Sequence, residues 1–301
     1  MHATLFHSII KHSGPIYDAV SDNLGHCFTS SADGFIAFWN VLKGEQDKLA
    51  IHVDVPCFSL TFNNEKNILL AGNRNGGLHF IDLNEQKEVK YITHHNRAIH
   101  SLQYSGLNQN YYCGDASGNL SIWDAENFQL KLNLPLGCGK IRKISLSECE
   151  KFLAVSAQDG ILRIFDTERF NEVVTIDNYE GVNCSLFYGD FIITGGKGAR
   201  LKIWNWKTGK LIKNIPAHNY LIYDILIFEK HNTLITASFD KSIKLWQLPD
   251  LDFIQKIDSS LKGHQSSVNR LCKIDKNHFI SVGDDRKILV WNLIDSTKSN
   301  Y

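Results

Sequence analysis

Residues 201–205 read Leu-Lys-Ile-Trp-Asn, a short segment that alternates apolar and polar side chains and ends in an aromatic residue followed by Asn. This period of two is typical of a β-strand with one buried face. A turn signal, Lys197-Gly198, precedes the segment, and a second, Lys207-Thr208-Gly209-Lys210, follows it. The stretch therefore predicts one strand of an antiparallel sheet, flanked by tight turns.

Segments of the same kind occur seven times along the 301 residues. Their aligned anchor positions are Trp39, Ile81, Trp123, Phe165, Trp204, Trp246 and Trp291. The successive separations are 42, 42, 42, 39, 42 and 45 residues. Units of nearly constant length with few helix signals indicate a repeat architecture.

A turn signal also precedes every anchor. These signals are Asp33-Gly34, Asn75-Gly76, Ser117-Gly118, Asp159-Gly160, Lys197-Gly198, Asp240-Lys241 and Asp285-Arg286. Each unit has room for four short strands, and one such sheet cannot bury both of its faces, whereas seven stacked radially can. We therefore predict an all-β fold, a seven-bladed β-propeller with four-stranded blades.

The period, the Trp-Asn or Trp-Asp endings and the upstream histidines resemble the WD40-repeat family over essentially the whole chain. In that family a His before the blade, a Ser or Thr on the second strand, an Asp in the following turn and the Trp form a hydrogen-bonded set. The resemblance implies three such sets: His12, Thr29, Asp33 and Trp39; His218, Thr236, Asp240 and Trp246; His264, Ser281, Asp285 and Trp291. A buried His needs partners for both ring nitrogens, and the carboxylate and hydroxyl supply them.

The other four units depart from this pattern. The second has Asn75 and Ile81, the third has Ser117, the fourth has no corresponding His, and the fifth has Gly198. We expect those blades to be held less rigidly at one end.

The two ends of the chain complement each other. Residues 292–301 are polar and irregular, whereas residues 4–10, Thr-Leu-Phe-His-Ser-Ile-Ile, are apolar and belong to no unit of their own. We expect residues 4–10 to pair as the outermost strand of the last blade, which removes an open sheet edge. We also expect residues 1–301 to form a single domain with a flexible tail at 296–301.

Composition limits the class of protein and its partners. Hydrophobic residues make up 43% of the chain, which excludes wholesale disorder. Lys+Arg and Asp+Glu both number 32, so the chain as a whole has no attraction to nucleic acid or to an anionic membrane. No apolar stretch reaches the roughly 18 residues of a membrane helix, and residues 1–7 show no secretory signal. We therefore expect neither a membrane nor a nucleic acid as partner.

Cysteine usage predicts the compartment. The seven cysteines, Cys27, Cys57, Cys113, Cys138, Cys149, Cys184 and Cys272, are widely spaced and form no CxxC pair. This usage is typical of reduced thiols and predicts a cytoplasmic protein without a disulfide framework. Cys27 and Cys113 lie in strand patterns and are expected in the core. Cys138, between Gly137 and Gly139, is the candidate for a reactive thiol in a flexible loop.

Two patterns suggest ligand binding, but a structural role fits each better. His94, His95 and His100 form the densest histidine group, yet a metal site needs three or four converging ligands, and His95 fits the histidine that precedes a blade. Residues 195–198, Gly-Gly-Lys-Gly, have the composition of a phosphate loop but connect two strand patterns instead of a strand and a helix. We predict no metal and no cofactor.

His218, Asp240 and either Ser238 or Thr236 supply the residue types of a catalytic triad. The same residue types recur at the same offsets in several units, whereas an active site would not be expected in triplicate. Catalysis also requires a pocket and an accessible nucleophile, which the repeat does not supply. We predict no catalytic residues.

In a propeller of this register, the residue just inside each first strand and the residue before each turn share one rim, where the resemblance places peptide binding. From these positions and Lys140 we predict a partner-binding site composed of Tyr17, Phe58, Arg74, His100, Lys140, Arg142, Lys197, Tyr223 and Phe239. Aromatic and Arg side chains are favoured interface anchors. The basic arc of Arg74, Lys140, Arg142 and Lys197 suits an acidic segment.

The sequence thus favours a non-catalytic scaffold or adaptor, monomeric on its own, that binds protein or peptide partners within a larger complex. One alternative is a propeller enzyme that uses the central channel, which would need converging His, Asp, Glu or metal ligands at the strand starts. The other is nucleic-acid-associated binding through the basic arc, which the balanced charge disfavours.

Overall fold

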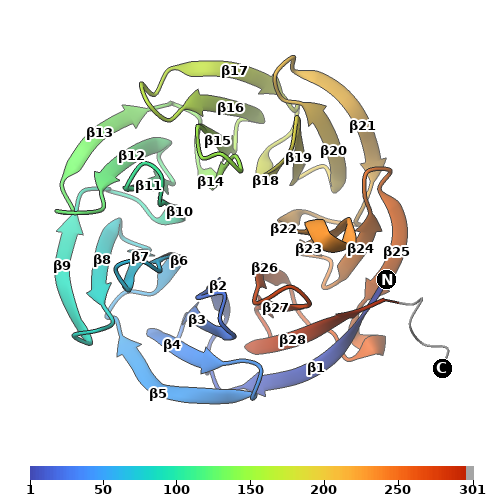
Figure 1. Cartoon of the computed structure of the whole chain (residues 1–301), viewed down its shortest axis with the longest axis horizontal. Helices are drawn as coiled ribbons and strands as arrows, with labels where there is room; N and C mark the ends of the chain where they lie inside the picture. The colour runs from blue at the N-terminus through green and yellow to red at the C-terminus, as the bar shows by residue number, and fades with distance from the viewer. Residues whose placement is uncertain (296–301) are drawn as a thin grey trace. The chain divides into compact units, whose positions relative to one another are not determined.

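The repeated strand pattern forms seven antiparallel sheets of four strands each in the structure, a computed structural model that describes residues 1–295 (Figure 1). Each sheet is one blade of a β-propeller, so the predicted fold class is confirmed. The blades fall into two compact units, Met1–Pro56 with Ile222–Tyr301 and Cys57–Leu221. The expected tail at 296–301 lies outside the described residues, and the single domain stays a prediction.

The first unit contains blades 1, 6 and 7. Blade 1 consists of β2 (Ile16–Ser21), β3 (His26–Ser31), β4 (Phe35–Asn40) and β5 (Glu45–His52). Blade 6 consists of β22 (Ile222–Phe228), β23 (Thr233–Ser238), β24 (Ile243–Gln247) and β25 (Asp252–Ile257), with the 3-10 helix η1 (Glu229–His231) between its first two strands. Blade 7 consists of β26 (Val268–Lys273), β27 (His278–Gly283), β28 (Lys287–Ile294) and β1 (His2–Ile10), and the 3-10 helix η2 (Ser259–Leu261) precedes it.

The second unit contains blades 2 to 5. Blade 2 consists of β6 (Cys57–Asn63), β7 (Ile68–Asn73), β8 (Gly77–Asp82) and β9 (Lys87–Thr93). Blade 3 consists of β10 (Ile99–Ser105), β11 (Asn110–Asp115), β12 (Asn119–Asp124) and β13 (Leu130–Pro135). Blade 4 consists of β14 (Ile141–Leu146), β15 (Phe152–Ala157), β16 (Ile161–Asp166) and β17 (Glu172–Asp177). Blade 5 consists of β18 (Val182–Tyr188), β19 (Phe191–Gly196), β20 (Arg200–Asn205) and β21 (Lys210–Pro216).

Burial along each blade explains its residue types. The second strand is covered on both faces, as in β7, β11 and β23, where every residue is buried. Such strands are mostly apolar or small in their middle and carry polar residues at one or both ends. The outer strands β9, β13 and β21 alternate exposed and half-buried side chains, because one face lies against the blade and the other meets solvent.

Neighbouring blades of a unit share one apolar core. Between blades 6 and 7, Phe228 and Leu245 pack in one buried cluster with Phe279, Leu289 and Trp291. Cys27 and Cys113 are fully buried in such clusters, as predicted. Because apolar burial stabilises by about 25 cal/mol per Å², these faces bind each blade to the next within the unit.

The N-terminal strand completes the last blade. β1 pairs antiparallel with β28 along the outer edge of blade 7 (Figure 1), with Thr4 opposite Asn292 and Ile9 opposite Ile288. The predicted closing strand at residues 4–10 is therefore confirmed, and it begins two residues earlier, at His2.

The turn at Asn75-Gly76 shows why glycine occurs before an anchor. Gly76 has φ +94°, and a Cβ there would lie 2.0 Å from the carbonyl oxygen of His95. The residue must therefore adopt the left-handed region and also leave room for the segment that precedes the next blade.

Within residues 1–295 the structure contains no helix of the length and apolar character needed to cross a membrane.

Replacing Ile9 tests the contribution of β1 to folding. Ile9 is 5% exposed and packs in one cluster with Ile288 and Val290, whereas its neighbour Ile10 is 60% exposed. We expect Ile9→Ala to lower the free energy of unfolding by about 2–4 kcal/mol through the cavity it leaves. Ile10→Ala should change it by less than about 0.5 kcal/mol. Urea unfolding measures both, and equal values for the two variants would contradict this role of β1.

Candidate partner-binding surface

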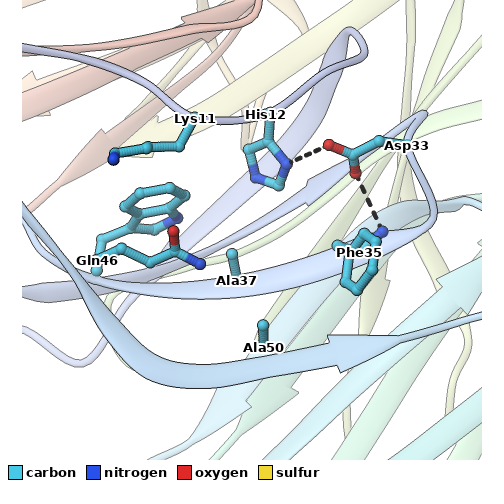
Figure 2. Close-up of a pocket in the computed structure, with 8 residues that line it drawn as sticks. Lys11, His12, Asp33, Phe35, Ala37, Gln46 and Ala50 are labelled. Atoms are coloured by element: carbon cyan, nitrogen blue, oxygen red, sulfur yellow. Dashed lines mark hydrogen bonds and ion pairs between the residues drawn. The ribbon is translucent and has the colours of Figure 1, made fainter.

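Hydrogen bonds join three segments of blade 1. The Trp39 indole donates to Thr29 Oγ1 at 2.7 Å, and that oxygen lies 2.8 Å from His12 Nε2. His12 Nδ1 lies 2.8 Å from Asp33 Oδ2, and Asp33 also accepts the N–H of Phe35 (Figure 2). Blade 7 repeats this geometry with His264, Ser281, Asp285 and Trp291, at distances of 2.8, 2.8 and 2.9 Å. The segment before each blade is thereby fixed to its second strand and to the following turn.

Blade 6 contains the third set of residues in a related arrangement. The Trp246 indole donates to Thr236 Oγ1 at 3.1 Å, and Asp240 accepts the Ser242 hydroxyl at 2.6 Å. His218 is buried in the segment before β22.

Blade 3 contains a complete set that the sequence pattern missed. His95 Nδ1 lies 2.8 Å from Asp115 Oδ2, His95 Nε2 lies 2.8 Å from Ser121 Oγ, and the Trp123 indole donates to Ser121 at 2.7 Å. The hydroxyl therefore comes from the third strand, because Cys113 occupies the usual place and Ser121 is its cross-strand partner. The expectation that blade 3 lacks the set is wrong.

Blade 5 replaces the histidine with an amide. The Trp204 indole donates to Thr194 Oγ1 at 3.1 Å, and the Thr194 hydroxyl donates to Asn178 Oδ1 at 3.1 Å. Lys202 Nζ donates to the carbonyl of Asn178 at 2.6 Å. A buried asparagine with a neighbouring lysine thus supports the tryptophan of this blade.

The predicted site residues divide between the two units. Tyr17, Tyr223 and Phe239 belong to the first, and the Tyr223 and Phe239 rings meet edge to face at 6.2 Å. Phe239 is 45% exposed at the β23–β24 turn. Asn269, in the position of blade 7 that corresponds to Tyr223, donates to the carbonyl of Ile16 at 2.9 Å and to Asp284 at 2.8 Å. The first-unit part of the surface is therefore aromatic and polar.

A buried charge network lies one residue further along these inner strands. Arg270 of β26 lies 2.5 Å from Asp18 of β2 and 3.6 Å from Asp224 of β22. Asp18 also accepts the N–H of Ala19, and Asp224 accepts the N–H of Leu271. Burial by itself would lower the pKa of Arg270, but the two carboxylates outweigh it and raise that pKa above its ordinary range. The guanidinium therefore stays charged and joins three inner strands. The residues directly before Asp18, Asp224 and Arg270 on these strands are Tyr17, Tyr223 and Asn269.

The second unit brings aromatic and basic residues to one end of its inner strands. The Phe58 and His100 rings stack at 5.6 Å with 12° between their planes. Arg142 lies on β14 just after Lys140, whereas Arg74 and Lys197 lie in the β7–β8 and β19–β20 turns. Because the second strand of each blade runs antiparallel to the first, these turns lie at the end where the inner strands begin. Arg74, Lys140 and Lys197 are exposed, and Arg142 is partly exposed.

Side-chain hydrogen bonds hold these inner strands in register. Ser59 Oγ donates to the carbonyl of Ile99 at 3.0 Å, and Ser101 Oγ accepts the N–H of Ile144 at 2.8 Å. The hydroxyls of Ser145 and Ser185 lie 3.0 Å apart. The basic and aromatic residues are thus attached to a stiff base.

Cys138, the candidate for a reactive thiol in a flexible loop, is instead buried: its side chain is 1% exposed, and burial raises the pKa of its thiol. Within residues 1–295, no group of three or more His, Cys, Asp or Glu side chains is arranged to hold a metal ion. The arrangement of exposed cations and aromatic rings suits recognition of a partner.

A β-propeller whose blades carry His–Asp–hydroxyl–Trp sets defines a class of repeat proteins. The WD40 family model (WD domain, G-beta repeat) matches residues 209–247 and 255–292. Each match runs from the outer strand of one blade through the first three strands of the next. The sequence repeat is therefore offset from the structural blade by one strand. Together with the seven blades, these matches show that the chain contains WD40 repeats in a seven-bladed β-propeller, and WD40 propellers typically act as scaffolds or adaptors in protein complexes.

The chain is similar to parts of several longer proteins. Pre-mRNA-processing factor 17 from Homo sapiens is 23% identical over 254 residues, which cover 79% of this chain and 44% of that protein. Autophagy-related protein 16 from Arabidopsis thaliana is 20% identical and covers 79% of this chain and 47% of its own. WD repeat and SOCS box-containing protein 1 from Homo sapiens is 34% identical over 34% of this chain and 24% of its own. The chain spans less than half the length of these relatives.

Asp115 makes the blade 3 set sensitive to acid. Burial would raise the pKa of Asp115, but hydrogen bonds from His95 and Asn119 outweigh it and lower that pKa to about 2. Since the unfolded carboxyl has a pKa near 3.9, the stability that the folded state gains is present above about pH 4 and is lost as the pH falls toward 2. We expect Asp115→Asn to lower the free energy of unfolding at pH 7 by about 1–3 kcal/mol. The variant should also lose less stability than wild type between about pH 5 and pH 2.

Urea unfolding at a series of pH values measures this difference. Asp54→Asn is the control, because its carboxylate is 98% exposed, and it should follow wild type. Parallel curves for Asp115→Asn and wild type would contradict the linkage.

Replacing Arg270 tests the buried charge network. Arg270→Met leaves the two buried carboxylates without their cation, and we expect it to lower the free energy of unfolding by about 3–5 kcal/mol. The triple variant with Asp18→Asn and Asp224→Asn should recover part of this loss, because it removes the unpaired charges. Arg286→Met, at an exposed turn, is the control. A change for Arg270→Met no larger than that of the control would overturn this role.

Proposed function

We propose that the chain is a non-catalytic, monomeric binding platform for protein partners. It binds them at the end of its blades where the inner strands begin, which we call the loop-end surface. Each unit contributes its own candidate region: Tyr17, Tyr223 and Phe239 in the first, and the aromatic pair and basic arc in the second. The presence of WD40 repeats supports the general role of scaffold or adaptor.

The observation that carries the proposal is the composition of the second-unit surface. The stacked pair of Phe58 and His100 shares its end of the unit with Arg74, Lys140, Arg142 and Lys197. Among the carboxylates at this end of the unit, Asp115 is hydrogen-bonded to His95, Asp159 is paired with Arg163 at 2.7 Å, and Glu180 is exposed and lies against Gly198 in the β19–β20 turn. The four basic residues outnumber these three carboxylates. The surface therefore favours a partner segment with acidic side chains and at least one apolar or aromatic anchor.

The similar proteins supply no single partner. Their names refer to pre-mRNA processing and to autophagy, among others, so the resemblance supports a shared way of binding and no particular pathway. The seven cysteines, all within residues 1–295, are free thiols, which supports a cytoplasmic location.

Charge reversal tests the proposed surface. The variant Arg74→Glu, Arg142→Glu and Lys197→Glu should lose its partners in a crosslinking pull-down from native lysate, by at least about tenfold in recovered amount, because it reverses the field that attracts an acidic segment. A control with the same number of reversals, Lys151→Glu, Arg169→Glu and Lys210→Glu, should retain them, since these exposed side chains lie outside the surface.

The first-unit part of the surface has its own variant. Tyr223→Ala with Phe239→Ala should lose those partners that need an aromatic anchor. Circular dichroism verifies that each variant folds. Partners retained by both surface variants would contradict the proposal, and a salt-sensitive complex with an oligonucleotide would favour nucleic-acid binding instead.

A further inference from the structure

A pocket of about 210 Å³ lies on the flank of blade 1. Ala37 and Trp39 of β4 and Gln46 and Ala50 of β5 line it. Figure 2 shows Ala37 and Ala50 on one side and Phe35 at one end. Lys11 and His12, from the connection between β1 and β2, cover the opposite side. All of these residues belong to the first unit, on the side of the blade instead of its loop ends.

Two small residues open this space. Ala37 lies two residues before the anchor Trp39, and Ala50 is its partner on the neighbouring strand. The corresponding pairs in blades 2 to 6 are His79 with Tyr91, Ser121 with Asn133, Arg163 with Thr175, Lys202 with Asn214, and Lys244 with Lys256. Blade 1 therefore lacks the side-chain volume that these pairs supply in blades 2 to 6.

A wide bulge in β5 enlarges the same space. From Ala37 to Trp39, β4 advances by two residues, whereas the partners on β5 run from Ala50 to Gln46, which is four. In blades 2 to 6 the third strand advances by one residue while the outer strand runs through two. Blade 1 thus has two extra residues on its outer strand where those blades have one, and extra residues of this kind bend the strand locally.

Two other blades show how the same place is closed. In blade 3, His94 packs edge to face on Trp123 at 5.2 Å and lies 3.3 Å from Asn133 Oδ1. In blade 6, Lys244 Nζ lies 5.9 Å over the Trp246 ring. The residues that correspond in blade 1 are Lys11, Ala37 and Ala50, which make neither contact.

Polar groups at the mouth have capacity to bind. Within residues 1–295, the Lys11 ammonium and the Gln46 amide have no hydrogen-bond or ion-pair partner, and both side chains are exposed. Asp33, the carboxylate that lines the pocket, accepts bonds from His12, Ser13 and Phe35, so its charge is already satisfied. Figure 2 shows Lys11 and Gln46 at the end of the pocket away from Asp33 and Phe35.

We propose that this pocket binds one apolar side chain of a partner's linear peptide segment, with a neighbouring carboxylate of that segment paired to Lys11. The volume is below the roughly 300–1,000 Å³ of a small-molecule site, which favours a single side chain over a cofactor. The 41% exposed Phe35 ring and the two alanines supply the apolar contact. The unpaired cation at the mouth selects an acidic neighbour, and the Gln46 amide can hydrogen-bond to the peptide backbone.

The position of the pocket beside an edge strand also suits a peptide. β5 is the outermost strand of blade 1 in the order β2-β3-β4-β5, so an extended segment can lie along it while one side chain enters the pocket. The fixed His12–Asp33 pair keeps the far end of the pocket in place before a peptide binds. This site is separate from the loop-end surface and depends on neither of that surface's variants.

Selection from a library of random heptapeptides displayed on phage tests the proposal. Wild-type protein should enrich sequences with a Leu, Ile, Met or Phe within two positions of an Asp or Glu, and Ala50→Phe, which fills the pocket, should not. The best-enriched peptide, made synthetically with a fluorescent label, should bind Ala50→Phe at least about tenfold more weakly by anisotropy. Replacing its apolar residue with Ala should have an equal effect.

Two further variants separate the pocket from its surroundings. Lys11→Glu should weaken binding of the acidic peptide by at least about fivefold. The same variant should bind more tightly a version of the peptide with Lys in place of its acidic residue. Thr175→Phe, at the corresponding outer-strand position of blade 4, should stay within about twofold of wild type. Circular dichroism and thermal unfolding establish that the variants fold. An absence of enrichment, a basic motif, or binding unchanged by Ala50→Phe would overturn the proposal.

Discussion

The chain of hydrogen bonds from a tryptophan indole through a hydroxyl and an imidazole to a carboxylate is the constraint on which much of the surface depends. In blade 1 it joins the segment before β2, the second strand and the following turn. These bonds are buried, so each carries more weight than an exposed one. Tyr17 follows His12 by five residues, and the flank pocket ends at the His12–Asp33 pair. Both sites are therefore held by the same few bonds.

The first unit adds a second constraint that no other described blade repeats in this form. Arg270 lies between Asp18 and Asp224 at the starts of three inner strands, one of them in the blade that contains both β1 and β28. A buried ion pair contributes little net stability over an apolar contact, because desolvation offsets the attraction. Its value lies in register, since a carboxylate on each neighbouring strand must meet one guanidinium. The residues just before these three charges form part of the proposed binding surface.

The hydrogen-bonded set tolerates exchange of its members. In blade 3 the hydroxyl moves from the second strand to the third, because Cys113 and Ser121 lie opposite each other and reach the same histidine. In blade 5 the Asn178 amide takes the place of the imidazole. Two hydrogen bonds are retained in these blades: the indole N–H donates to a hydroxyl, and that hydroxyl is hydrogen-bonded to an imidazole or an amide. A pattern of fixed residue types at fixed offsets cannot find such exchanges, since they connect residues that are neighbours only across a strand pair.

The sequence by itself determined the number of blades, the four strands in each and the pairing of residues 4–10 with the last blade, and its resemblance to the WD40 family implied the His–Asp pairs that blades 1 and 7 form. The blades and the closing strand follow from a local period and from an apolar segment that needs a partner, and such patterns can be read along the chain. Only the tertiary structure decided the burial of Cys138, the complete set in blade 3, the Arg270 network and the flank pocket. These depend on which side chains face each other across strands and blades. Ala37 and Ala50 are unremarkable in sequence and open a pocket solely because β4 and β5 place them opposite each other above a bulge.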